Sequence, residues 1–275
     1  MNDKPVEENR VNKAIRELGI DHKEAKRANA MLTELLMKRK AERKKDYSLE
    51  ERTLGNFFSY ALPRVKDAQG QLFQDLWVLW ELGGDHHGGF FVEFGATNGI
   101  TMSNSHILEK KYGWNGIVAE PNPEYHERLG RERDCQISHK CVYSTTGQTF
   151  KFLCAEKGLM SRLSHINPED HNEQNGKRIV KEEIDVETIS LEDLLTEYNA
   201  PDEIEYMSVD TEGSELEILK AFDFSKRNVK MLTVEHNFTP LRQEIYDLLS
   251  ANGYKRRFPE YTRFDDWYIH ESLDQ

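Results

Sequence analysis

Short apolar runs alternate with amphipathic segments along most of the chain after residue 55. The short runs predict buried strands, and apolar positions that recur every three or four residues predict helices between them. The predicted strands are 90–94, 116–120, 136–143, 150–154, 205–210 and 231–235, and the predicted helices are 72–80, 103–112, 123–131, 191–198, 215–222 and 240–252. A final hairpin, 254–258 with 267–270, follows them. This order predicts an α/β fold, a Rossmann-like doubly wound sheet that ends in an antiparallel hairpin.

Residues 1–55 have a different pattern, because they are highly charged and poor in aromatic side chains. Val11, Ile15 and Leu18 begin an apolar stripe with helical spacing, so we expect a helical hairpin and a short third helix. The predicted division is therefore a charged helical extension, 1–55, and an α/β domain, 56–275. The extension could pair with a second copy of the chain or fold back on its own domain. Its basic run, 38–45, is either a solvated helix end or a contact with anionic lipid or a lipid-linked glycan.

Charge and composition narrow the class of protein. The net charge is −12, of which the first 55 residues contribute +3 and the remainder −15. An acidic body argues against nucleic acid as a partner, since phosphate neutralisation dominates such binding. No apolar run approaches the ~20 residues of a membrane-spanning helix. The three cysteines show no metal-type spacing, and the N-terminus has no apolar core, so we expect a cytoplasmic protein with reduced thiols.

Two strand ends carry a pattern that is typical of a nucleotide site. The strand 90–94 runs into Gly95-Ala96-Thr97-Asn98-Gly99, and the next strand ends at Glu120. A glycine turn lets a ligand approach backbone N–H groups, and the later carboxylate can accept both ribose hydroxyls. The G-x-G-x-x-G pyrophosphate fingerprint is absent, so the pattern favours an adenosine cofactor without pyrophosphate, of which S-adenosylmethionine is the commonest. The alternative is an ordinary strand–helix turn in a domain without this ligand.

Two later strand ends carry acidic residues and a histidine. Asp210 and Glu212 follow one predicted strand, and Glu235 and His236 end the next. Carboxylates with an imidazole could hold Mg²⁺ or Mn²⁺, or one of these groups could remove a proton from a hydroxyl. Helix capping is the alternative explanation, and it accounts poorly for Asp210 and for the Glu235–His236 pair.

Taken together, these segments resemble the FkbM family of S-adenosylmethionine-dependent methyltransferases over roughly residues 55–270. The resemblance rests on several motifs in order: Gln74-Asp75, Phe91–Gly99, Ser103-Asn104, Leu108-Glu109, Gly113-Trp114-x-Gly116, Glu120-Pro121-Asn122-Pro123, Asp210–Glu215, Glu235-His236-Asn237 and Asp265-Asp266-Trp267-Tyr268. It implies a class I methyltransferase sheet and O-methylation of a sugar or polyketide hydroxyl, so we expect an O-methyltransferase whose acceptor is a carbohydrate or glycan.

The resemblance also implies roles for single residues. The methionine part of the cofactor would lie against Glu93, Gly95, Ala96, Asn98 and Gly99, with Asn104 and Pro121 as further cofactor contacts. Glu120 would bind the ribose, and Cys141 and Val142 would flank the adenine. Asp210 and Glu235 resemble divalent-metal positions, with His236 beside them. Related enzymes often carry a Lys or His base three residues after the first acid, where this chain has Gly213, so Asp210, Glu212 and His236 all remain candidates for the catalytic group.

Two other classes of protein remain compatible with the sequence. One is a nicotinamide oxidoreductase on the same type of sheet, against which the missing dinucleotide fingerprint argues. The other is a non-catalytic docking component of a glycan-assembly complex, against which the dense acids at two strand ends argue.

Overall fold

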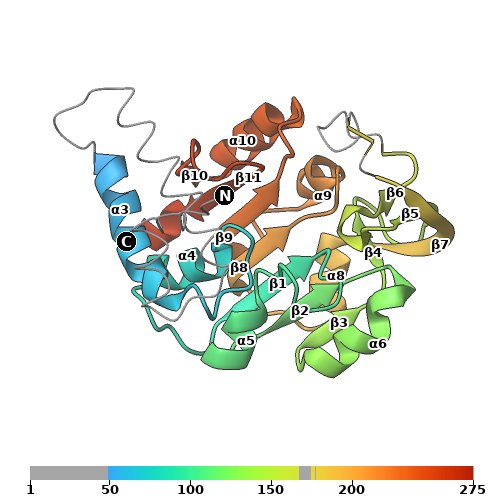
Figure 1. The fold of residues 1–275 in the computed structure, drawn as a ribbon. Helices are drawn as coiled ribbons and strands as arrows, with labels where there is room; N and C mark the ends of the chain where they lie inside the picture. Colours follow the sequence, from blue (N-terminus) through green and yellow to red (C-terminus); the bar gives the residue numbers. More distant parts are fainter. Residues whose placement is uncertain (1–48, 167–174, 177, 275) are drawn as a thin grey trace, which may run out of the picture.

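A seven-stranded sheet forms the centre of the molecule (Figure 1). The computed structural model describes residues 49–166, 175–176 and 178–274. The strand order is β10-β11-β9-β8-β1-β2-β3. The bounds are β1 Phe90–Phe94, β2 Asn115–Ala119, β3 Gln136–Ser138, β8 Glu203–Val209, β9 Asn228–Glu235, β10 Tyr254–Arg257 and β11 Asp265–His270. The five strands from β9 to β3 are parallel, and β11 runs antiparallel to both β9 and β10. This confirms the predicted doubly wound sheet with its C-terminal antiparallel hairpin.

Helices cover both faces of this sheet, which explains why its strands read as continuous apolar runs. Neighbouring residues of β1 enter different cores: Phe91 packs with Trp77 and Trp114, whereas Val92 packs with Leu194 and Ile218. The helices are α3 Leu49–Ala61, α4 Gln74–Glu81, α5 His106–Tyr112, α6 Pro123–Glu132, α8 Leu191–Glu197, α9 Glu215–Ala221 and α10 Leu241–Ala251, with short 3-10 turns η1 Leu62–Arg64, η2 Gly158–Met160 and η3 Glu271–Asp274.

Helix α3 joins the predicted extension to the α/β domain. It continues through Gly55 without a break, and Leu54 and Phe57 are both fully buried in the core that α4 helps to form. The Phe57 ring lies edge-on to Trp267 of β11, with 6.0 Å between the ring centroids. The end of the extension therefore packs on the domain. The predicted helical hairpin and the basic run 38–45 lie outside the described residues.

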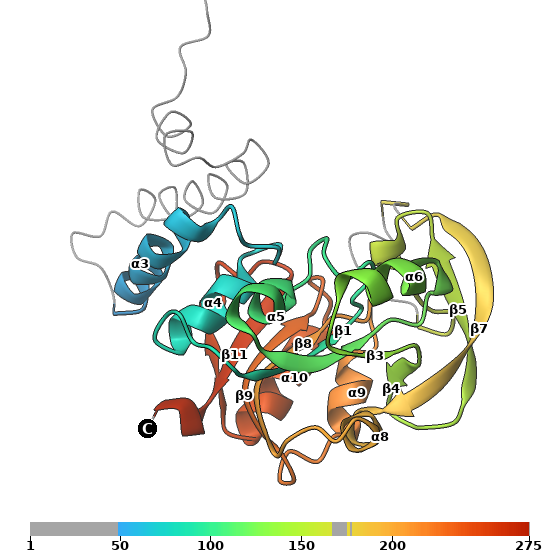
Figure 2. The same ribbon diagram turned by 90° about the horizontal axis from the view of Figure 1, so that it is seen from below.

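A second, four-stranded sheet was not expected from the sequence. Its order is β4-β7-β5-β6, with β4 Cys141–Tyr143, β5 Thr149–Ala155, β6 Arg162–Leu163 and β7 Val180–Ser190. It lies at the end of the molecule away from α3 (Figures 1 and 2). The prediction of one strand over 136–143 is wrong, because the chain turns at 139–140 and delivers β3 and β4 to different sheets.

Strand β7 could not be recognised from its sequence pattern because five of its eleven residues are charged: Lys181-Glu182-Glu183, Asp185 and Glu187. Its pairing with β5 and β4, not its own apolar pattern, makes it a strand. Across the described residues, the helices are too short or too polar to cross a membrane.

Candidate functional site

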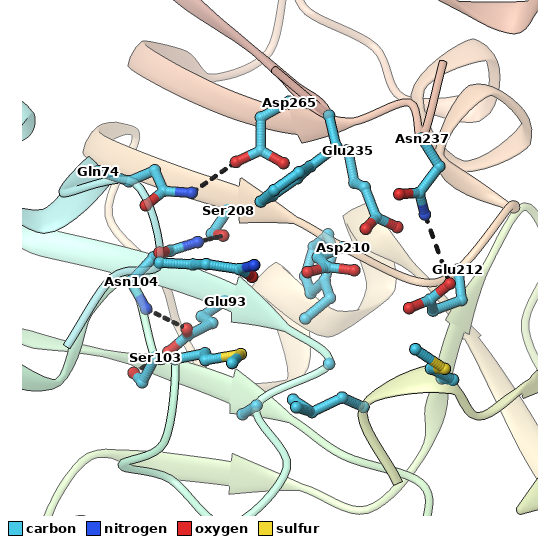
Figure 3. A pocket seen from close by; sticks show the side chains of 18 of the residues that line it. Gln74, Glu93, Ser103, Asn104, Ser208, Asp210, Glu212, Glu235, Asn237 and Asp265 are labelled. Atoms are coloured by element: carbon cyan, nitrogen blue, oxygen red, sulfur yellow. Dashed lines mark hydrogen bonds between the residues drawn. The ribbon is translucent and has the colours of Figure 1, made fainter. Parts of the chain in front are cut away.

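Two adjoining cavities open at the carboxyl ends of the central parallel strands, where ligands of such sheets bind. We call them the Glu120 cavity, of about 60 Å³, and the Glu235 cavity, of about 300 Å³. The Glu120 cavity is bounded by Glu120, Pro121, Cys141 and Val142 among others. Figure 3 shows the polar wall of the Glu235 cavity, to which Gln74, Glu93, Asn104, Asp210, Glu235 and Asp265 belong. The two cavities share Phe94, Gly95, Leu159, Asp210 and Glu212, so their contents would be neighbours.

The turn after β1 brings two strand ends into close contact. Gly95 has a φ of +71°, and a Cβ atom placed there would lie 2.2 Å from the carbonyl oxygen of Asp210. A side chain at this position is therefore excluded both by conformation and by space. The N–H groups of Gly95 and Ala96 donate to the carbonyl oxygen of Ala119, which ties the turn to β2. The glycine at this position fixes the wall between the two cavities.

Glu120 is buried at the end of β2, with 3% of its surface exposed. Its carboxylate accepts one hydrogen bond from the N–H of Thr97 and another from the N–H of Asn122, both at 2.8 Å. Burial raises the pKa of Glu120 to about 7, and these two hydrogen bonds oppose that rise. Each oxygen keeps a second lone pair that can accept a hydroxyl. The geometry is therefore compatible with a ribose whose two hydroxyls donate hydrogen bonds to the buried Glu120 carboxylate.

The other predicted contacts of the cofactor fall into two groups. Glu93, Ala96 and Asn104 line the Glu235 cavity, and Gly95 lines both cavities. Asn98 and Gly99 line neither cavity. The Asn98 side chain instead accepts hydrogen bonds from the N–H groups of Ile100 and Thr101, which closes the loop. Asn98 therefore shapes the turn and does not line either cavity.

Glu93 is already bound by several protein donors. Its carboxylate accepts hydrogen bonds from Ser103 Oγ at 2.8 Å, from the Asn104 N–H at 2.7 Å and from Ser105 Oγ at 2.5 Å. The fully buried Arg133 guanidinium lies 3.4 Å away and also ion-pairs with Glu109 at 2.5 Å. Arg133 neutralises this buried acid, and no pattern around it in the sequence announced that role.

Asp210, Glu215 and Glu235 form the acidic centre of the site. One carboxylate oxygen from each lies within 4.8 Å of the others. Burial, together with the charges of Asp265 and Glu215, raises the pKa of Asp210 to about 8. Burial and the charge of Asp210 raise the pKa of Glu235 well above its ordinary range. These acids therefore require protons or a cation, and three carboxylates are a donor set that suits Mg²⁺ or Mn²⁺.

Glu212 lies beside this centre and is tied down differently. Its backbone has a positive φ of 58°, and its carboxylate forms an ion pair with the buried Arg178. Asn237 Nδ2 donates a second hydrogen bond at 3.4 Å. Burial and the charge of Asp210 nevertheless raise the pKa of Glu212 to about 8, with Arg178 opposing the rise.

His236 is not a member of the acidic centre, although the sequence grouped them, and it shares only a small side cavity with Glu215 and Glu235. Successive side chains of a strand point to opposite faces, so Glu235 and His236 diverge. The His236 ring accepts a hydrogen bond from the N–H of Phe238 at Nδ1, and Nε2 lies 3.8 Å from Asp266. Burial lowers the pKa of His236 to about 4. It lines neither the Glu120 cavity nor the Glu235 cavity, so the geometry does not support it as base or metal ligand.

Gln74 and Asp265 belong to the site, although the sequence analysis assigned neither a role. Gln74 Nε2 donates to Asp265 Oδ2 at 2.5 Å in the wall of the Glu235 cavity (Figure 3). Burial and the charge of Asp266 raise the pKa of Asp265 to about 7, while the hydrogen bond from Gln74 opposes this. Their only signal in the sequence was membership of the motifs Gln74-Asp75 and Asp265-Asp266.

Comparisons with known proteins place this site in a family. A family model described as the methyltransferase FkbM domain matches residues 93–256. Among solved structures, a methyltransferase FkbM from Methylobacillus flagellatus is similar at 13% identity and a TM-score of 0.44, covering 90% of this chain and 59% of that one. A precorrin-6y C5,15-methyltransferase from Geobacter metallireducens is similar at 12% identity and a TM-score of 0.37, covering 71% and 85%.

A putative sarcosine dimethylglycine methyltransferase from Galdieria sulphuraria is similar at 14% identity and a TM-score of 0.33, covering 70% of this chain and 64% of that one. No curated protein sequence matches the chain. The family match spans more than half of the sequence, from Glu93 through the acidic centre. Its sheet of five parallel strands followed by an antiparallel hairpin agrees with the class I methyltransferase sheet that the resemblance implied. The chain belongs to the FkbM methyltransferase family, and its cofactor is S-adenosylmethionine.

Proposed function

We propose that this methyltransferase transfers the methyl group of S-adenosylmethionine to a hydroxyl of a sugar or glycan. The observation that carries the proposal is the position of Asp210, which lies on the wall shared by the two cavities. A cofactor whose ribose contacts Glu120 would be next to an acceptor in the Glu235 cavity. A buried carboxylate at that junction is placed to accept the proton of the attacking hydroxyl.

The chemistry of the wall of the Glu120 cavity suits an adenosine group. Glu120 offers hydrogen-bond acceptors for the ribose, and the buried side chains of Cys141 and Val142 offer an apolar wall for the base. Strand β4 carries both of these residues, so the small sheet is needed to complete the cavity. The second sheet, which was not predicted from the sequence, therefore contributes to the proposed cofactor site.

The chemistry divides between cofactor and protein. The bound cofactor supplies an electrophilic methyl group, and the protein aligns the acceptor oxygen with it. Asp210 is our choice for the base, because a pKa of about 8 makes its carboxylate an effective proton acceptor near neutral pH. Glu212 is already ion-paired with Arg178, and His236 lies outside the cavity. In a metal-assisted version, Asp210, Glu215 and Glu235 would hold Mg²⁺ or Mn²⁺, and the ion would supply the positive charge that makes a hydroxyl more acidic.

The Glu235 cavity favours a polyhydroxylated acceptor. Its wall combines acceptor groups such as Asp210 and Asn237 with an exposed aromatic side chain, Phe238, of which 64% is accessible. Carboxylates and amides can bind hydroxyls, while an aromatic face can pack against the apolar side of a sugar ring. A purely apolar acceptor would leave the buried acids without partners.

Calorimetric titration of S-adenosylmethionine into the chain and into Glu120→Ala tests the proposal. We expect binding that is lost or strongly weakened in the variant, with NADH giving no heat in either. Binding of NADH in place of S-adenosylmethionine would support the oxidoreductase. Absence of both, with or without Mg²⁺, would support a non-catalytic docking role.

A further inference from the structure

Two neighbouring residues of β11 have opposite electrostatic surroundings. Asp266 is buried and is ion-paired with Arg242 at 2.7 Å and with Arg256 at 3.1 Å. Asp265 is also buried, with 5% of its surface exposed, yet its one side-chain partner in the described chain is the neutral amide of Gln74. The strand places Asp266 toward these arginines and Asp265 toward the Glu235 cavity. The protein thus neutralises one acid and leaves the other facing the cavity.

Gln74 holds Asp265 in a fixed orientation. Its side-chain oxygen accepts a hydrogen bond from the N–H of Leu72 at 2.8 Å, and its amide nitrogen donates to Asp265 Oδ2. The amide is therefore fixed at both ends, and it engages one oxygen of the carboxylate. No donor in the described chain reaches Asp265 Oδ1, which leaves this oxygen for a ligand.

A second carboxylate lies directly beside Asp265. The antiparallel register pairs Asp265 with Glu235, so the two side chains share one face of the sheet (Figure 3). Like charges directly opposite one another across strands are destabilising. Among the described residues that line this cavity, none is Lys, Arg or His. We expect such a pair of acids to be retained where a positively charged ligand binds to it.

A third carboxylate faces the same cavity. Asp210 lines it together with Glu235 and Asp265. The methyl donor carries one ammonium group, whose single positive charge balances only one of these three carboxylates. The exposed Phe238 ring adds a surface that attracts cations.

We propose that Asp265, oriented by Gln74 and paired with Glu235, is a specificity-determining residue that binds an ammonium group of the acceptor, so that the substrate is an amino sugar. This inference rests on the proposed sugar methylation and narrows it. An ammonium donates up to three hydrogen bonds and adds one positive charge, which suits the two carboxylates. An anionic sugar would meet only like charges in the cavity wall.

The test compares three sugars of one scaffold that differ in charge: glucosamine, glucose and glucuronate. Each is titrated into the full chain loaded with S-adenosylhomocysteine at pH 7.5 and low salt, with binding followed by saturation-transfer NMR. We expect glucosamine to bind about tenfold more tightly than glucose, and glucuronate to bind most weakly. In Asp265→Asn the preference for glucosamine should fall to about twofold, while glucose binding stays unchanged.

The exposed acid Asp185, which pairs with Lys151 on the small sheet, provides the matched control, because Asp185→Asn removes the same charge from a strand. That variant should keep the full preference. Equal binding of glucosamine and glucose, an unchanged preference in Asp265→Asn, or no saturable binding of glucosamine would each overturn the inference. Binding of S-adenosylhomocysteine is measured first on every variant, so it verifies folding. Its absence in the wild type would reject the proposed function itself.

Discussion

Gly95 lies against Asp210 so closely that a Cβ atom on the glycine would be 2.2 Å from the aspartate carbonyl oxygen. The contact joins the glycine turn after β1 to the acidic centre after β8. It therefore couples the part of the site that we propose for the cofactor to the part that carries the proposed base. A change at Gly95 should disturb both parts at once.

Gly95→Ala is accordingly expected to destabilise the protein by about 2–3 kcal/mol and to remove cofactor binding. The matched control is Gly113→Ala, because Gly113 has a similar φ of +66° but no atom within 4 Å of a Cβ placed there. The control keeps the conformational strain without the clash, so it should cost about 1 kcal/mol and leave binding intact. Urea unfolding and calorimetry measure both. Equal effects of the two variants would show that the contact with Asp210 is unimportant.

Arg133 is expected to be essential for the fold near the Glu235 cavity, which its partner Glu93 lines. Replacing it by Met would leave Glu93 and Glu109 buried without their cation, which should cost about 3–5 kcal/mol. Arg131→Met is the control, because 65% of the Arg131 side chain is exposed, and its loss should change stability little. Urea unfolding of both variants gives the comparison. A loss below about 1 kcal/mol in Arg133→Met would mean that Glu93 does not need this charge.

The sequence revealed the fold more completely than the site. The positions of the central strands along the chain, the glycine turn and the carboxylate of Glu120 at a strand end could be predicted, because apolar runs and local turns are encoded in neighbouring residues. Strand β7 was not, since its charged sequence becomes a strand only by pairing with β5. The orientation of the His236 ring could not be predicted from the sequence either, because the alternation of side chains along the strand turns it toward Asp266. The roles of Arg133 and Gln74 depend on partners that are distant in the sequence, and no sequence spacing predicts such contacts.

Cofactor affinity should depend on pH through Glu120. Burial raises the pKa of this carboxyl group from its ordinary 4.5 to about 7, so it is mostly protonated at pH 6 and ionised at pH 8. The ionised form is the better acceptor for two ribose hydroxyls, so affinity for S-adenosylmethionine should rise as pH increases, by close to tenfold per unit below pH 7. Calorimetry at pH 6, 7 and 8 measures this. The side chain in Glu120→Gln does not titrate, so the affinity of this variant for S-adenosylmethionine should be weaker and should change less with pH. An equally steep pH profile in the variant would assign the effect to another group.

The buried acids of the site should make the ligand-free protein less stable at alkaline pH. Glu120 and Asp265 both have folded-state pKa values raised to about 7 by burial, and Asp210 has one raised to about 8. The folded state therefore binds more protons than the unfolded state between about pH 4 and pH 8. The free energy of unfolding contributed by these groups falls as pH rises through that window and stays low above it. Urea unfolding from pH 5 to 9 tests this, and stability that increases over the range would contradict it.

A divalent cation should relieve this instability if the acidic centre is a metal site. We expect Mn²⁺ to raise the melting temperature at pH 8 more than at pH 6, since the cation must displace the protons that Asp210 and Glu235 otherwise hold. Asp210→Asn and Glu235→Gln should remove the effect, because each takes away one of three ligands. His236→Ala should keep it, because that ring faces Asp266. A Mn²⁺ effect lost in His236→Ala but kept in Asp210→Asn would return the histidine to the site. No Mn²⁺ effect on the wild type would leave Asp210 to act as the base with a shared proton.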